Sequence, residues 1–200
     1  FGLLMAYLSA APFVLRNVLG MGTVAYTAVF GLCGTTVTVT IAVAASLVRR
    51  FSQARQVRVG LIAGLVVDTV FAAVCLMWLR EPVAGSVRIP LLVAVVALFL
   101  AHVACLGLSM GNAPALALDR TGRWAGTGSA LLGFLQFVVG GLVSPLVGLT
   151  GEASGVAFGV VIVAVGAIAN LLAVFGLRER GEKQRLAAQA SERRQQRLGQ

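Results

Sequence analysis

Residues 90–110 of the chain read PLLVAVVALFLAHVACLGLSM, an apolar stretch in which His102 is the one strongly polar side chain. A helix that crosses the about 30 Å of bilayer hydrocarbon needs about 20 mostly apolar residues, and this stretch has that length. Similar runs lie on both sides of it, so that six runs cover approximately residues 1–15, 23–48, 57–79, 90–110, 125–149 and 156–177. The first run is short, and we interpret it as a span cut off at its N-terminus. The runs predict an all-α membrane protein with six transmembrane helices.

The composition excludes a water-soluble domain. Hydrophobic residues make up 58% of the chain and charged residues only 12%. The net charge of +9 does not indicate a nucleic-acid partner, because the basic residues flank the apolar runs or follow Leu177. Each of the three cysteines, Cys33, Cys75 and Cys105, falls inside a run without metal-ligand spacing, so we expect packing residues and no metal site.

Basic residues alternate between the two sides of the predicted membrane. The connection after the second run contains Arg49, Arg50, Arg55 and Arg58, and residues 178–200 form a basic tail. The positive-inside rule places these segments in the cytoplasm. We therefore expect a multi-pass protein of the cell (inner or plasma) membrane, with both ends cytoplasmic and the tail near anionic headgroups of the lipid bilayer.

Small residues are expected to bring the helices together, because lipid gives apolar side chains no reason to associate. The pairs Gly60/Gly64 and Gly155/Gly159 have the small-xxx-small spacing. The fifth run is richest in such positions, and its interface candidates are Gly126, Ser129, Gly133, Gly140, Gly141 and Pro145. Two interpretations stay open for this run: tight packing, or a deformable helix at a moving interface.

Two local features bear on helix geometry. The β-branched run 35–40 resembles a strand by composition, but a lone strand would leave its backbone unpaired in lipid, so we expect a helix. Pro12 lies deep in the first run and should kink or interrupt that helix and free a carbonyl near residues 7–10.

A few strongly polar side chains lie deep within the runs: Asp68, His102, Gln136 and Asn170. Asp68 and His102 fall at similar depth near the middle of the membrane. The two side chains pair, or either carries a proton, or each has a packing role only. Gln136 and Asn170 are expected to bridge helices. Tyr7 and Ser9, beside the proline, are better candidates for a cavity wall.

The sequence contains no GxSxG, no HExxH and no phosphate-binding Gly-Lys-Ser/Thr loop. We therefore expect no enzyme and no cofactor, and we expect transport or passive conduction.

Three stretches resemble a known family. They are Tyr-Leu-Ser-Ala-Ala-Pro-Phe-Val at residues 7–14, Leu-Val-Arg-Arg-Phe at residues 47–51, and residues 112–137 with Asn112, Arg123, Gly126, Ser129, Gly133 and Gln136. Together they resemble the C-terminal half of a major facilitator superfamily transporter of the Bcr/CflA drug:proton antiporter group. Arg49 and Arg50 resemble the superfamily's cytoplasmic loop motif, although the acid and the glycine of that motif are missing. Asp68 matches no residue of the group's pattern.

The resemblance implies an architecture and a function. It implies a half made of two inverted three-helix repeats, whose partner is a missing N-terminal six-helix half. The first and fourth helices would line the path of a small amphipathic substrate, with Tyr7, Ser9, Pro12, His102, Ser109 and Asn112 on or near it. The third and sixth helices would be peripheral, which gives Asp68 a supporting place. A proton gradient would supply the energy. The alternatives are a non-transporting six-span protein, such as a channel subunit or scaffold, and an inactive gene fragment.

Overall fold

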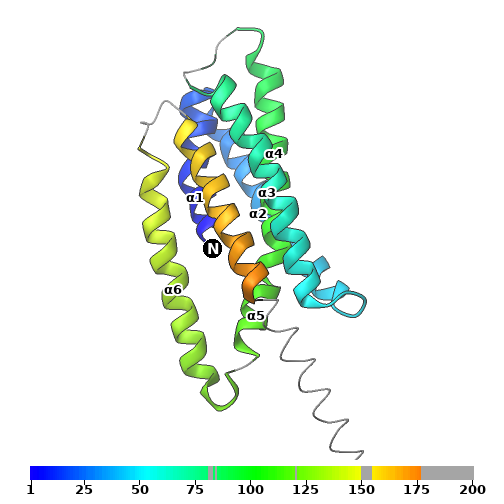
Figure 1. Ribbon diagram of the computed structural model, residues 1–200. Helices are drawn as coiled ribbons and strands as arrows, with labels where there is room; N and C mark the ends of the chain where they lie inside the picture. Colours follow the sequence, from blue (N-terminus) through cyan, green and yellow to red (C-terminus); the bar gives the residue numbers. More distant parts are fainter. Residues whose placement is uncertain (81–82, 84, 120, 150–154, 177–200) are drawn as a thin grey trace, which may run out of the picture.

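The computed structural model describes residues 1–80, 83, 85–119, 121–149 and 155–176, which form a bundle of helices (Figure 1). Its elements are α1 (Gly2–Pro12), the π-helical turn η1 (Phe13–Val18), α2 (Thr23–Leu47), α3 (Gln53–Trp78), α4 (Arg88–Met110), α5 (Asn112–Leu118), the short 3-10 turn η2 (Gly122–Trp124), α6 (Ala125–Leu146) and a last helix, Val156–Gly176. All regular structure in the described part of the chain is helical, which confirms the all-α prediction. The predicted basic tail, 178–200, lies outside the described residues.

Among the described residues, five helices are long and apolar enough to cross a membrane by length and composition. They are α2, α3, α4 continued by α5 as Arg88–Leu118, α6 with η2, and the last helix. The helix Gly2–Val18 is shorter. The fourth helix extends beyond the apolar run 90–110, because its backbone stays helical through Gly111 into α5.

The threonine-rich part of α2 is helical, as the lipid argument predicts. The four threonine hydroxyls of this part each donate to the carbonyl four residues earlier, at 2.8–2.9 Å. The pairs are Thr35 to Gly31, Thr36 to Leu32, Thr38 to Gly34 and Thr40 to Thr36. This bonding keeps the hydroxyls paired inside an apolar environment. The β-branched composition therefore does not produce a strand.

Pro12 changes the helical register and does not break the chain's helical path. The α-helical turns end at Pro12, and a π-helical segment follows from Phe13 to Val18. The segment closes with the Leu19 N–H donating to the Val14 carbonyl at 3.1 Å. Since proline has no N–H, a wider turn after it is one way to recover backbone hydrogen bonds. The predicted interruption thus takes the form of a wider helical turn.

The centre of the bundle lies between α1, α3, α4 and the last helix. Phe71, Phe99 and Phe158 are fully buried there, and their rings meet at centroid distances of 4.8 Å, 5.1 Å and 5.7 Å. By contrast, only 11% of the residues in the most apolar part of α2 and of α6 are buried, against 28–39% in the other three long helices. Much of α2 and α6 therefore faces outward from the described chain.

Glycines let neighbouring helices approach at two crossings. A Cβ on Gly107 of α4 would lie 2.7 Å from Thr40 Cβ of α2, and one on Gly159 of the last helix would lie 2.9 Å from Cys75 Cβ of α3. These distances are shorter than real carbon–carbon contacts, so only glycine fits. The pattern agrees with close backbone approach as the source of helix association in lipid.

The connections gather at two ends of the bundle (Figure 1). The turn between α2 and α3 and the segment between α5 and α6 lie at the lower end in that view, and the connections after η1 and α3 lie at the upper end. At the upper end Arg88 donates from Nε to the Leu19 carbonyl at 2.8 Å and from Nη2 to the Gly20 carbonyl. A positively charged side chain is favourable beside the unpaired carbonyls at the C-terminal end of a helix. Arg88 therefore connects α4 to the end of η1 through these hydrogen bonds.

The Gly107 crossing gives a stability prediction. Gly107→Ala should lower the free energy of unfolding by about 1–3 kcal/mol, because the added methyl overlaps Thr40. Gly111→Ala is the matched control, since its Cβ would lie at an ordinary 3.5 Å from Ile41 and alanine is the better helix former. Thermal unfolding of the purified variants in detergent measures the difference. Equal stability of the two variants would contradict the close α2–α4 approach.

Candidate functional site

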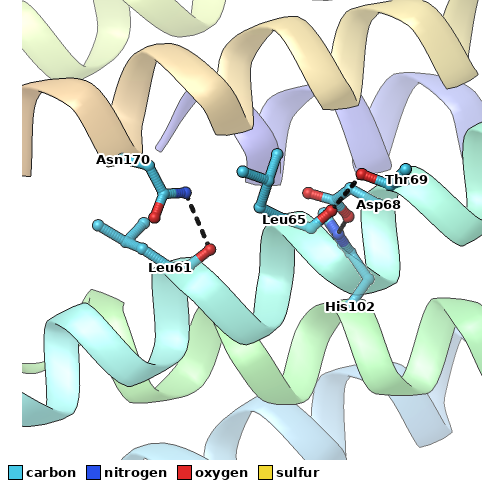
Figure 2. A network of polar contacts seen from close by, with 6 residues as sticks. All are labelled: Leu61, Leu65, Asp68, Thr69, His102 and Asn170. Carbon is cyan, nitrogen blue, oxygen red and sulfur yellow. Dashed lines mark hydrogen bonds and ion pairs between the residues drawn. The ribbon is translucent and has the colours of Figure 1, made fainter.

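Asp68 of α3 and His102 of α4 form a buried ionisable pair (Figure 2). His102 Nδ1 lies 2.5 Å from Asp68 Oδ1, and the two side chains are 1% and 0% exposed. The structure thus confirms the pairing alternative. This short contact between two ionisable side chains joins α3 to α4 near the middle of both helices.

One aromatic ring lies beside the pair, and two more rings pack in sequence behind it. The Tyr7 ring of α1 lies 6.3 Å from the His102 ring, and it makes an edge contact with Phe99 at 5.3 Å. Phe99 in turn packs on Phe71. An apolar shell of this kind excludes water and strengthens electrostatic interactions inside it.

Each partner keeps one polar atom without a hydrogen bond. Asp68 Oδ2 and His102 Nε2 are buried and have no partner among the residues that the structure describes. The last helix presents Gly166 here, and a Cβ on it would lie 3.4 Å from Asp68 Oδ2. Unpaired buried polar atoms are uncommon and call for an explanation. Asp68 Oδ2 is a potential acceptor, and His102 Nε2 is a donor or an acceptor according to the tautomer.

A second buried polar cluster joins α3 to α5. Asn112 Nδ2 donates to Gln56 Oε1 at 3.1 Å and to the Leu108 carbonyl at 2.9 Å, and Gln56 Nε2 donates to the Phe51 carbonyl at 3.2 Å. Ser109 is buried one turn before Asn112, and its Oγ has no partner within the described chain. Because these groups are amides and a hydroxyl, the cluster positions helices without holding a proton.

A third polar contact joins the last helix to α3. Asn170 Nδ2 donates to the Leu61 carbonyl at 2.9 Å (Figure 2). It also donates to the Gly166 carbonyl of its own helix at 2.9 Å. Arg58, Ile62, Ala173 and Val174 complete a shallow pocket beside Asn170. Asn170 therefore has the helix-bridging geometry expected from the sequence.

The substrate-path candidates separate into two groups. Tyr7, His102, Ser109 and Asn112 are buried between helices, with Tyr7 beside His102 and Ser109 beside Asn112. Ser9 and Pro12 lie on the partly exposed side of α1. The Ser9 hydroxyl is hydrogen-bonded to the Ser144 hydroxyl of α6. The first group is buried among the described helices, and Ser9 of the second group contacts α6.

The interface candidates on α6 also separate. A Cβ on Gly140 would lie 2.6 Å from Met5 Cγ, so Gly140 packs against α1. Gly126, Gly133 and Gly141 have open space at the Cβ position, and Ser129 and Pro145 are exposed. One end of α6 therefore contacts α1, and much of the rest is open.

The loop-motif residues and the remaining polar candidate lie at the surface. Arg49 and Arg50 are exposed in the turn after α2, where the Arg50 N–H donates to the Leu47 carbonyl at 2.9 Å. Gln136 of α6 is half-buried.

Sequence reasoning missed two partner residues. Gln56 precedes the apolar run 57–79, which predicts a place in the connection, whereas it is the fourth residue of α3 and is 5% exposed. Its nearness to the N-cap Ser52 is the signal that would have placed it on the helix. Ser144 carries no sequence signal that links it to Ser9.

The amide cluster gives a second stability prediction. Asn112→Ala should cost about 1–3 kcal/mol, because it leaves the buried Gln56 carbonyl without its donor. Adding Gln56→Leu should restore part of the loss, since replacing both partners is less costly than removing one. A double-mutant cycle of unfolding free energies measures the coupling. Additive effects would show that the two amides act independently.

Comparison with known proteins finds one informative similarity. The chain is 28% identical over 176 residues to the uncharacterized MFS-type (major facilitator superfamily) transporter YdgK of Bacillus subtilis (strain 168). The match covers 86% of this chain, and the chain spans about 40% of the length of that relative. No protein-family model and no solved structure matches the chain. The similarity is to a transporter and not to an enzyme, and together with the apolar helices it supports a multi-pass membrane protein of the major facilitator superfamily.

Proposed function

We propose that this chain is the C-terminal half of a proton-coupled transporter of the Bcr/CflA drug:proton antiporter group. It exports small amphipathic molecules from the cell by alternating access, in exchange for protons. The observation that carries the proposal is the match over 86% of this chain to only 40% of a superfamily transporter. The Tyr-x-Ser-x-x-Pro-Phe-Val stretch of α1 and the stretch 112–137 favour this group within the superfamily.

In this proposal the partner half docks on the outward faces of α2 and α6. These two helices are the least buried of the long helices. Gly31 and Gly34 of α2, like Gly133 and Gly141 of α6, have open space at the Cβ position. Faces with small residues suit close approach of a second helical bundle. Helices 1–3 and 4–6 are then the two inverted repeats, with the substrate path along α1 and α4.

The lower end of the bundle in Figure 1 is the cytoplasmic end in this proposal. The turn between α2 and α3, which contains Arg49 and Arg50, and the η2 turn, which contains Arg123, lie at that end. Their positive charge favours the cytoplasmic side of the cell membrane.

The full-length gene product provides the direct test. Its coding sequence upstream of Phe1 should encode about six more spans on inverted-repeat logic. Cells that express it should expel a fluorescent amphipathic dye faster than control cells, and a protonophore should abolish the difference. Dye export that persists after collapse of the proton gradient would rule out antiport, and absence of upstream spans would rule out the half-transporter.

The docking faces give a further prediction. Gly34→Leu and Gly133→Leu should reduce dye export by about tenfold or more while expression of the full-length protein remains, because a bulky side chain separates the two halves. Leu171→Phe, at a 59% exposed position of the last helix, is the control and should leave export unchanged. Loss of export only in the control would place the partner half on the opposite side of the bundle.

A further inference from the structure

We infer that the Asp68–His102 pair is a proton-binding site within this half, and that it takes up and releases one proton as the helices rearrange. The assignment of that proton to transport rests on the proposed function. The binding of the proton does not, because it follows from the geometry of the pair.

The geometry leaves a place for the proton. When His102 Nδ1–H donates to the Asp68 carboxylate, Nε2 holds a free lone pair, and no described group donates to it. The pair then bears one negative charge. Addition of a proton at Nε2 removes that charge, and release of the same proton to water restores it. The two protonation states belong to the pair and not to either residue alone.

No described charged group near the pair balances its charge. Tyr7 of α1 and Cys105 of α4 are the titratable neighbours, and Cys33 of α2 lies behind Tyr7. The last helix contributes Gly166, which has no side chain. The described arginines lie at helix ends or in connections, so they do not balance a charge at this depth. A negative pair without a countercharge is costly in an apolar interior, and a proton bound at Nε2 brings the net charge of the pair to zero.

Proton exchange therefore requires a rearrangement that admits water. Both side chains are closed off in the described arrangement, at 0% and 1% exposure. Tyr7 packs beside His102 from α1, the helix that continues into the π-helical turn. A π-helical turn is a frequent feature of functional sites in helices. A shift of α1 against α4 would uncover the pair on this side and allow the proton to leave.

A spectroscopic experiment tests proton binding without transport. The chain contains a single histidine, so 15N-histidine labelling reports on His102, and a His102→Gln spectrum identifies its signal in any longer gene product. In lipid bilayers, the His102 signal should change protonation form between about pH 5 and about pH 8 when dye is present. Asp68→Asn should move the midpoint of that change. If Asp68→Asn does not fold, infrared difference spectra of the wild-type protein with labelled aspartate should show a carboxyl band that changes over the same pH range. A histidine signal and a carboxyl band that both stay constant, with and without dye, would overturn the inference.

A transport experiment tests what the proton does. In the full-length protein, Asp68→Asn should abolish proton-driven dye export, with a loss of about tenfold or more, and should retain dye movement down its own gradient. Asn170→Leu is the matched control, because it breaks a partly buried contact of α3 that cannot hold a proton. It should lower both activities together. Equal loss of both activities in Asp68→Asn would show a packing role and overturn the coupling assignment. Wild-type dye export that is the same with and without a proton gradient would overturn the proposed function. The histidine signal would still decide whether the pair binds a proton.

Discussion

The absence of water from the bilayer core is the constraint on which the rest of this structure depends. Every backbone N–H and carbonyl in the hydrocarbon must find a partner within its own helix, since unsatisfied groups cost several kcal/mol each. The threonines of α2 show the constraint at the level of side chains, because their hydroxyls return to carbonyls one turn earlier. Pro12 shows it at the level of the backbone, where a wider turn follows the missing N–H.

The same constraint decides how the helices associate. Apolar side chains gain little by leaving lipid for protein, so shape and buried polar contacts must hold the bundle together. α3 is the helix on which these contacts meet. It pairs with α5 through Gln56, with α4 through Asp68 and with the last helix through the Leu61 carbonyl. The three contacts lie at successive levels along α3, and they fix the rotation of its neighbours.

Much of this arrangement was predictable from the sequence, and the reasons differ by feature. Helix positions follow from apolar length, so α2 and α4 begin within two residues of the runs 23–48 and 90–110. The pairing of Asp68 with His102 was one of three alternatives, because run position gives depth but not the rotation of a helix about its axis. Contacts such as Ser9 with Ser144, 135 residues apart, depend on which helices become neighbours. These helices are apolar on all sides, so the periodicity of apolar residues is weak. The sequence pattern therefore does not show which helix packs beside which.

The unequal strength of the helix contacts bears on movement. α3, α4, α5 and the last helix share buried polar contacts and a common aromatic cluster, whereas α6 contacts mainly α1, through Gly140, Phe137 and the Ser9–Ser144 hydrogen bond. Displacement of α6 from α1 would break one hydroxyl pair and van der Waals contacts, but displacement of α3 from α4 would separate a buried acid from its partner. A buried charge left without its partner costs about 3–5 kcal/mol. Movement within this bundle is therefore less costly between α6 and α1 than between α3 and α4, where the Asp68–His102 pair lies.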